Sequence, residues 1–469
     1  MEPPKDYWFV MGEYLPPPYG ILQLAAFLEN KNKDVEIAVL DCQAKHLNWK
    51  GMEKYIESFD PDIVASSALA TCNTYVAVRT LETAKKVKPD ILTVAGGQHF
   101  TVMAQESLET YPEIDVIVRG EGELTLVELV QAFAKKRPFS EIEGISFRHN
   151  GKILHCPPRP LIENLDDLPF PGYQFVEDIV HEYHFTAMAG PKTRYALVEG
   201  SRGCPHRCTF CTQWRHWEGT WRAKSPKRIA DEMEFVYQKY GSRFIWLTDD
   251  NLGLSRRASE LADEIIQRGF SDDMMWFMQV RCDDVVNRRN ILPKMRKSGL
   301  RWTLLGVESH SPSTLKTFGK EINPEDAKMT VNLLKENDIF AHAMFIIGER
   351  KDSAESIANL REFVNDLDPD LAIFAILTPF PGTEIFEEAK RNGWIEDWNW
   401  ANYDMVHAIM PTETLSINEV QEELYKCYRS FFGSWNRRFK GLFSGNEIRR
   451  RVYWYMATRG IVKQLRGLY

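Results

Sequence analysis

Short apolar runs alternate with stretches of helical periodicity along the first 140 residues. Four runs bounded by turn residues lie at 35–41, 62–68, 91–97 and 114–118. Apolar positions recur with helical spacing around them, at 20–30, 49–59, 73–87 and 123–135. Strands that alternate with helices are typical of a parallel sheet covered on both faces. The pattern therefore predicts an α/β domain, doubly wound and Rossmann-like, over residues 1–140.

The N-terminus departs from that pattern. A doubly wound domain normally begins with an apolar strand, whereas this chain opens on Pro3-Pro4, which is typical of a loop. We therefore expect that a first strand is missing upstream of Met1.

The alternation returns after a proline-rich segment. Residues 141–192 contain PPRP and LPFPG and predict a linker or strap. Apolar runs then recur at 195–201, 244–250, 274–280, 302–309, 341–348 and 370–380, with helical stretches at 226–240, 256–268, 289–298, 324–337 and 353–366. This repetition favours a partial (β/α)6 barrel over residues 193–400, with catalytic residues in the loops that follow the strands. A helical C-terminal region, 401–469, follows.

Composition excludes several classes of function. The 469 residues carry a net charge of −8, which argues against nucleic acid as a partner. No window approaches the roughly 18 apolar residues that a membrane span requires, and the N-terminus has no export signal. We expect a cytoplasmic protein without a membrane span that acts on a small molecule. The basic residues between Arg437 and Arg451 are most simply explained as a solvated helix face.

Three of the eight cysteines lie in one short segment, GCPHRCTFCTQW. Cys204, Cys208 and Cys211 form a C-x3-C-x2-C loop directly after the first barrel strand. Three thiolates can hold three irons of a [4Fe–4S] cluster and leave the fourth iron open for chemistry. A zinc site that uses His206, or three ordinary buried thiols, are the alternatives. The scattered cysteines are interpreted as structural: Cys42, Cys72, Cys156, Cys282 and Cys427.

This spacing and position resemble the radical S-adenosylmethionine (SAM) superfamily, which also has an aromatic residue, here Phe210, before the third cysteine. The resemblance implies that SAM chelates the open iron. An electron from a low-potential donor such as ferredoxin or flavodoxin then cleaves SAM to a 5′-deoxyadenosyl radical.

Segments at later strand ends resemble the SAM-binding motifs of that superfamily. LTDDN places Asp249 and Asp250 where the family holds the amino group of SAM, although its usual Gly-Gly-Glu-like turn is absent. LLGVES implies a ribose contact from Glu308. The last two motifs, FIIGERKDSAES and TPFPGT, imply adenine contacts from Gly348 and Glu349 and closure over SAM by Pro379.

The first domain resembles the cobalamin-binding domain of one large radical SAM subgroup. The resemblance lies in YLPPPYGILQLAAFLE, AGGQHFT and VIVRGEGE. It implies cofactor contacts from Tyr14, Gly20, Gly96, Gly97, His99, Gly120, Glu121 and Gly122. The Asp-x-His-x-x-Gly signature of a lower histidine ligand is absent, so we interpret His99 as a loop residue that contacts the corrin or is solvated. A domain that has lost its cofactor is the alternative.

Nearly the whole chain resembles the anaerobic magnesium-protoporphyrin IX monomethyl ester cyclases. CTQWRHW and the tail EIRRRVYWYMATRGIVKQL carry this likeness. It implies oxidative closure of the fifth ring of magnesium-protoporphyrin IX monomethyl ester. Trp214, Trp217 and Trp221 would suit this flat tetrapyrrole, with core or loop packing as the alternative role for these tryptophans. A cobalamin-dependent radical SAM methyltransferase is the main alternative. An iron–sulfur electron-transfer scaffold without turnover is a third, but it predicts four cysteine ligands.

Overall fold

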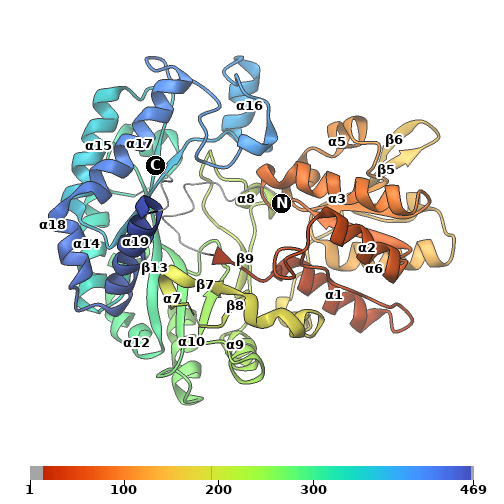
Figure 1. Ribbon diagram of the computed structural model, residues 1–469, viewed down its shortest axis with the longest axis horizontal. Coiled ribbons are helices and arrows are strands. Elements are labelled where there is room, and N and C mark those ends of the chain that lie inside the picture. The colour runs from red at the N-terminus through yellow and green to blue at the C-terminus, as the bar shows by residue number, and fades with distance from the viewer. Residues whose placement is uncertain (1–13, 192, 321, 466–469) are drawn as a thin grey trace.

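Two sheets organise the chain, one in each half (Figure 1). The computed structural model describes residues 14–191, 193–320 and 322–465. The first half, red to orange in the figure, lies beside the second half, green to blue. The strand expected upstream of Met1, with Pro3-Pro4, lies outside the described residues.

The first sheet runs in the order β2-β3-β4-β5-β6 among the described residues. Its parallel part consists of β2 (Ile63–Ser67), β3 (Leu92–Gly96) and β4 (Val116–Val118). The helices are α1 (Tyr19–Lys31), α2 (Trp49–Phe59), α3 (Thr74–Val87), α4 (Gln98–Val102), α5 (Ala104–Thr110) and α6 (Gly122–Ala134), with 3-10 turns η2 (Thr71–Asn73) and η3 (Phe139–Glu141).

Helices cover both faces of this sheet. Ala95 packs with Leu81 of α3 and Leu108 of α5. Val94, its neighbour in the strand, points to the other face and packs with Leu129 of α6. The prediction of a doubly wound domain is confirmed.

The run at 35–41 is not a strand, so this prediction was wrong. It has no regular secondary structure, and β2 is the strand at that edge of the sheet among the described residues. Its apolar side chains pack against helices: Ile37 lies beside Phe27 of α1, and Leu40 lies beside Met52 of α2. A run of apolar residues indicates that a segment is buried. Because a segment buried against helices has the same apolar pattern as a strand buried in a sheet, the pattern alone does not predict a strand.

The segment 141–192, expected to be a linker, extends the first sheet. β5 (Ile145–His149) pairs antiparallel with β4 and with β6 (Lys152–His155). Asn150 and Gly151 join the two strands with φ of 50° and 74°. Asn-Gly favours such tight turns, so the sequence did contain a signal for this hairpin. The segment continues through η4 (Leu165–Asp167), η5 (Tyr173–Glu182), β7 (His184–Phe185) and α7 (Thr186–Ala189).

The second sheet is parallel throughout and runs in the order β15-β14-β13-β12-β11-β8. It contains the six expected barrel strands, so the partial barrel is confirmed. Their bounds are β8 (Tyr195–Val198), β11 (Phe244–Leu247), β12 (Met275–Arg281), β13 (Leu300–Glu308), β14 (Phe340–Ile347) and β15 (Leu371–Ile376).

Helices surround this sheet. They are α9 (Pro226–Tyr240), α10 (Arg256–Gln267), α11 (Cys282–Asn287), α12 (Leu292–Lys297), α13 (Pro312–Thr317), α14 (Pro324–Glu336), α15 (Ala354–Leu367) and α16 (Glu384–Arg391). The helix expected at 289–298 is divided into η6 (Arg289–Ile291) and α12. Short elements complete this half: β1 (Tyr14–Leu15) pairs with β7, β9 (Ser201–Gly203) pairs with β10 (Trp221–Ala223), and α8 (Gln213–His216) follows the cysteine loop.

The expected helical C-terminal region is present. It contains η7 (Trp400–Asn402), α17 (Ile417–Gly433), α18 (Trp435–Leu442) and α19 (Glu447–Leu465). Ile448 and Val452 of α19 pack with Phe185 and Trp302 in one apolar cluster, so α19 covers the amino ends of the barrel strands. In the described part of the chain, no helix is both long and apolar enough to span a membrane.

Candidate active site

The cysteine loop begins where β9 ends. Gly203 has φ of 88°, and a Cβ there would lie 2.1 Å from the carbonyl oxygen of Thr220. Only glycine allows β9 and β10 to approach this closely. The chain therefore enters the loop at the carboxyl end of the first barrel strand, as expected.

Contacts from the neighbouring loop hold the cysteine loop in place. The Thr209 amide donates to the Phe318 carbonyl (3.0 Å), and the Phe210 ring meets the Phe318 ring edge-on, with centroids 5.1 Å apart. The Trp214 indole donates to the Cys208 carbonyl (2.9 Å). Phe210 is thus used in packing against Phe318.

The donor set of this loop fits an iron–sulfur cluster. All three cysteines are half-buried and free of disulfide bonds. Burial raises the pKa of each thiol, that of Cys211 to about 12. Among the residues described, no three His, Cys, Asp or Glu side chains converge on a position for a single metal ion. A cubane does not require such convergence, because each of its irons takes one thiolate.

The two aspartates after β11 have different environments. Asp249 is fully buried and accepts a hydrogen bond from Ser201 Oγ (2.6 Å). Asp250 is only partly buried, and burial, with the charge of Asp249, raises the pKa of its carboxyl to about 7. Its charge acts on Cys204 and Cys211, which places it beside the cysteine loop. Of the two aspartates, Asp250 is therefore the better placed to meet a bound cofactor.

Glu308 has a partner that the sequence did not suggest. A bulge in β13 gives Glu308 a φ of 64°, and Lys320 Nζ lies 2.5 Å from its carboxylate. Both side chains are almost fully buried. A Cβ on Gly306 would lie 2.6 Å from both charged atoms, so that glycine makes room for the pair. Lys320 fixes the direction of the Glu308 carboxylate.

Asp352 holds the turn that follows the carboxyl end of β14. Asp352 accepts hydrogen bonds from the amides of Gly348 (2.9 Å) and Glu349 (3.1 Å) and from Ser356 Oγ (3.0 Å). Gly348 has φ of 82°, which favours glycine. Pro379, at the β15 end, is buried. Burial raises the pKa of Asp352 to about 6.

Because Asp352 has a raised pKa in the folded state, its charge opposes folding at neutral pH. Stability should therefore fall as pH rises from about 4 to about 6, by roughly 2–3 kcal/mol for this group. Asp352→Asn keeps the oxygen acceptor and removes the charge, so we expect this pH dependence to disappear in the variant. Anaerobic urea unfolding between pH 4 and 8 measures it. Parallel pH profiles for variant and wild type would contradict the assignment.

A cleft of about 440 Å³ separates the two halves of the chain. From the first domain it is lined by residues that follow the carboxyl ends of β2, β3 and β4, including Leu69, His99 of α4 and Gly120. From the barrel it is lined by Thr212 and Gln213, which directly follow Cys211. Gln98 donates to the Gln213 side chain (2.7 Å) and accepts from Thr212 Oγ1 (3.1 Å). The cysteine loop and the first domain therefore share one cleft.

The residues expected to contact cobalamin do not all reach this cleft. His99 and Gly120 line it. Gly97 has a φ of 94°, and a Cβ at this position would lie 2.6 Å from the carbonyl oxygen of Ala68, so glycine allows α4 to begin close to the end of β2. Gly96 ends β3 next to the cleft.

The other expected contact residues have different surroundings. Gly122 packs against Leu24, and Glu121 forms ion pairs, as described below. Tyr14 lies against Phe185 at the far end of the barrel, and Gly20 is exposed on α1.

His99 is neither a loop residue nor solvated, which corrects that part of the interpretation. It lies on α4 and is 3% exposed. Its Nδ1 is 3.4 Å from Thr71 Oγ1, and its ring meets Trp400 edge-on at 5.2 Å. Burial lowers the pKa of His99 to about 4, so the imidazole is neutral at pH 7. A contact with the corrin remains an expectation.

Arg202, two residues before Cys204, joins the two domains. Its guanidinium donates to Glu121 (2.7 Å) and Glu123 (2.6 Å) at the start of α6 and to Glu199 (2.9 Å). The side chains of Arg202, Glu121 and Glu123 are each 5% exposed. Burial alone would lower the pKa of Arg202, but the three carboxylates hold it well above its usual value. The strand that enters the cysteine loop is therefore anchored to the first domain in a site with little water.

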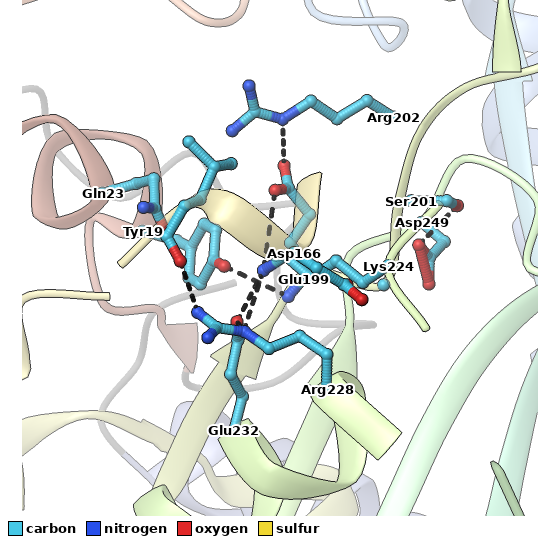
Figure 2. Close-up of polar contacts among 12 residues, drawn as sticks. Tyr19, Gln23, Asp166, Glu199, Ser201, Arg202, Lys224, Arg228, Glu232 and Asp249 are labelled. Carbon is cyan, nitrogen blue, oxygen red and sulfur yellow. Dashed lines mark hydrogen bonds and ion pairs between the residues drawn. The ribbon is translucent and has the colours of Figure 1, made fainter. Parts of the chain in front are cut away.

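The polar network continues behind Arg202. Figure 2 shows Glu199 between Arg202 and Lys224. Lys224 Nζ lies 2.8 Å from Glu232, and both side chains are fully buried; Arg228 also donates to Glu232 (2.9 Å). Such buried pairs add little net stability, but removing one partner is costly. The network therefore anchors the chain before the cysteine loop through contacts that are costly to remove one at a time.

Two family descriptions match the two halves of this chain. Residues 11–130 match the B12 binding domain, and residues 198–364 match the Radical SAM superfamily. The second range contains the cysteine loop and most of the barrel, while the first contains the three parallel strands of the first sheet.

Two relatives extend the likeness over nearly the whole chain. The chain is 33% identical over 417 residues to an uncharacterised methyltransferase of Pyrococcus horikoshii, covering 89% of this chain and 88% of that protein. It is 31% identical over 452 residues to the anaerobic magnesium-protoporphyrin IX monomethyl ester cyclase of Rubrivivax gelatinosus, covering 95% of this chain and 79% of the relative. The chain belongs to the cobalamin-binding radical SAM enzymes. The enzyme accordingly uses a [4Fe–4S] cluster, SAM and cobalamin, and an iron–sulfur scaffold without turnover is excluded.

A solved structure supports the fold of this radical SAM enzyme. The cobalamin-dependent SAM radical enzyme OxsB, with aqua-cobalamin and SAM bound, superposes with a TM-score of 0.73 at 16% identity, covering 96% of this chain and 70% of OxsB. At that identity the likeness concerns the fold alone.

Sequence reasoning missed Arg202, Lys320 and Asp352. Arg202 could have been noticed, because it directly follows the apolar run at 195–201 and an arginine is buried only when it is paired. No local signal marks Lys320 as the partner of Glu308. The pairing depends on the bulge in β13.

Proposed function

We propose that this enzyme transfers a methyl group from cobalamin to a carbon atom of a small substrate. When bound, the cluster and SAM supply the 5′-deoxyadenosyl radical, and cobalamin supplies the methyl group. The substrate gives up one hydrogen, which forms 5′-deoxyadenosine, and the methyl group replaces it. We assign to a ferredoxin or flavodoxin the reduction of the cluster and also of cobalamin after it has given up its methyl group.

The shared cleft carries this proposal. We place the corrin between His99 and Gly120 of the first domain and Thr212 and Gln213, which follow Cys211. The methyl donor and the radical source then adjoin one substrate position, as methylation of a substrate radical requires. We assign the SAM contacts to Asp250, to Glu308 held by Lys320, and to the turns at Gly348–Glu349 and Pro379.

The tryptophans that would suit a tetrapyrrole are engaged in other contacts. The Trp214 indole bonds to the Cys208 carbonyl. Arg202 and Arg222 lie over the Trp217 ring at 5.7 and 5.5 Å, and Arg257 lies 5.5 Å over Trp221. These contacts pack Trp214 and Trp217 beside the cysteine loop, while Trp221 stays 39% exposed, so the three rings do not form one surface for a planar substrate. We rank methyl transfer first because the likeness to the methyltransferase of Pyrococcus horikoshii covers 89% of this chain and 88% of that protein.

Oxidative ring closure on magnesium-protoporphyrin IX monomethyl ester is the second candidate. It is favoured by the likeness to the named cyclase over 95% of this chain. The two functions differ in how they use SAM. A methyltransferase must transfer the methyl group of SAM to its cobalamin in each cycle, whereas a cyclase need not.

The test uses the anaerobically reconstituted holoenzyme and SAM with a deuterated methyl group. The enzyme is reduced to its cob(I)alamin form, and products are read by mass spectrometry. We expect labelled methylcobalamin and S-adenosylhomocysteine without any added substrate. Absence of label, together with 5′-deoxyadenosine and a ring-closed, oxygenated porphyrin when the monomethyl ester is supplied, would replace our proposal with the cyclase.

A further inference from the structure

Four large aromatic side chains are exposed together on the C-terminal helices. Trp435, Phe439 and Phe443 are 81%, 66% and 66% exposed, and Trp454 of α19 is 49% exposed. The first three are spaced four residues apart, so Trp435 and Phe439 of α18 and its C-cap residue Phe443 form one stripe. The Trp454 indole donates to the Leu442 carbonyl (3.1 Å), which places its ring beside that helix. We name these four residues the aromatic face.

Such a group is unusual on a protein surface. Single exposed apolar residues are common, but clustered ones mark a surface that binds something. Phe439 and Phe443 contact each other, with ring centroids 4.8 Å apart. Both nevertheless leave most of their surface to solvent.

Positive charge surrounds the aromatic face. Residues 424–469 contain eleven Lys and Arg and a single acidic residue, Glu447, a formal charge of +10 in a chain whose net charge is −8. Arg438 lies over the Trp435 ring at 5.8 Å, and Arg450 bonds to the Ser444 carbonyl next to Phe443. Arg438, Lys440 and Arg450 are exposed.

The expectation of a solvated basic helix face holds for Arg438, Lys440 and Arg450 but not for every basic residue between Arg437 and Arg451. Arg437 is 7% exposed and pairs with Asp368 (2.6 Å), and Arg449 pairs with Asp370 (3.1 Å). These two arginines anchor α18 and α19 to the barrel. Arg438, Lys440 and Arg450 are not used in this anchoring, and their side chains face solvent beside the aromatic rings.

We propose that the aromatic face is a peripheral docking surface for an anionic lipid bilayer. Aromatic residues on one side of a short helix with Lys and Arg beside them match the chemistry of the bilayer interface, where rings lie among headgroups and cations meet acidic lipids. No described helix can span a membrane, so binding takes place at the surface.

The position of this face argues against the electron donor as its occupant. Asp368 and Asp370 precede β15, and Asp338, which accepts from Asn446, precedes β14, so α18 and α19 lie at the amino ends of the barrel strands. The cysteine loop lies at the carboxyl ends, roughly 25 Å away along strands of this length. α18 also lies on the side of the barrel opposite the first domain (Figure 1). Docking on lipid therefore leaves the cleft open.

The test is co-sedimentation of the anaerobic holoenzyme with vesicles of phosphatidylcholine alone or mixed with phosphatidylglycerol. We expect binding to the anionic vesicles that weakens with salt. Trp435→Ala/Phe439→Ala and Arg438→Glu/Lys440→Glu should each lower partitioning at least about tenfold. The matched controls are Tyr425→Ala, an exposed aromatic on α17, and Lys227→Glu, an exposed lysine on α9; both should bind as wild type does. All variants should still produce 5′-deoxyadenosine with a chemical reductant.

Three results would overturn the proposal. The first is no binding to anionic vesicles. The second is a dimer that Trp435→Ala/Phe439→Ala converts to monomer, which makes the face a contact between copies. The third is a loss of activity in Arg438→Glu/Lys440→Glu when flavodoxin is the reductant but not when a chemical reductant is used. This result would make the aromatic face a docking site for the electron donor.

Discussion

Cys208→Ala should leave the enzyme without its cluster. The variant keeps two thiolates, which cannot hold three irons, so bound iron, sulfide and the visible absorption of the cluster should fall to background. Production of 5′-deoxyadenosine should be lost with them. Cys204→Ala and Cys211→Ala should behave alike, because each thiolate serves a different iron. Iron and sulfide analysis after anaerobic reconstitution measures the effect.

Cys42→Ala is the control, since Cys42 is another partly exposed thiol that lies outside the cysteine loop. It should retain full cluster content and activity. A complete cluster in all three loop variants would refute the assignment of the ligands.

Arg202→Ala should cost about 3–5 kcal/mol of unfolding free energy. The substitution leaves Glu121 and Glu123 buried with one fewer cation, and Arg222 reaches only Glu121. Because these carboxylates belong to the first domain, the variant should also lose cobalamin during gel filtration. Anaerobic urea unfolding and the cobalamin content of the eluted protein measure the two effects.

Arg256→Ala is the matched control. Arg256 pairs with Glu260 at 2.8 Å, but both side chains are exposed, so its loss should cost less than about 1 kcal/mol. Replacing Arg202, Glu121 and Glu123 together with uncharged residues should recover much of the stability, because no buried charge is then left alone. Equal costs for the two arginine variants would show that the buried cluster does not hold the domains together.

Burial and pairing explain where prediction from sequence failed in the first domain. The apolar runs at 62–68 and 91–97 became β2 and β3, because in each of them the turn residues delimit a strand that helices cover. The run at 35–41 is also apolar and bounded by polar residues, yet it packs against helices, and the apolar pattern does not distinguish the two cases. The β5–β6 hairpin was overlooked because the prolines around it suggested a linker, although its Asn150-Gly151 turn was visible.

The sequence by itself determined the six barrel strands, three parallel strands of the first sheet and the cysteine loop. These depend on local spacing: the period of apolar residues, turn residues between runs, and three thiols within eight residues of chain. Only the tertiary structure decided which polar side chains meet. Arg202 and Glu121 are 81 residues apart, and Gln98 and Gln213 are 115 residues apart, yet both pairs lie where the domains join. Contacts at such separations arise when two independently patterned sheets pack together, and no local pattern encodes them.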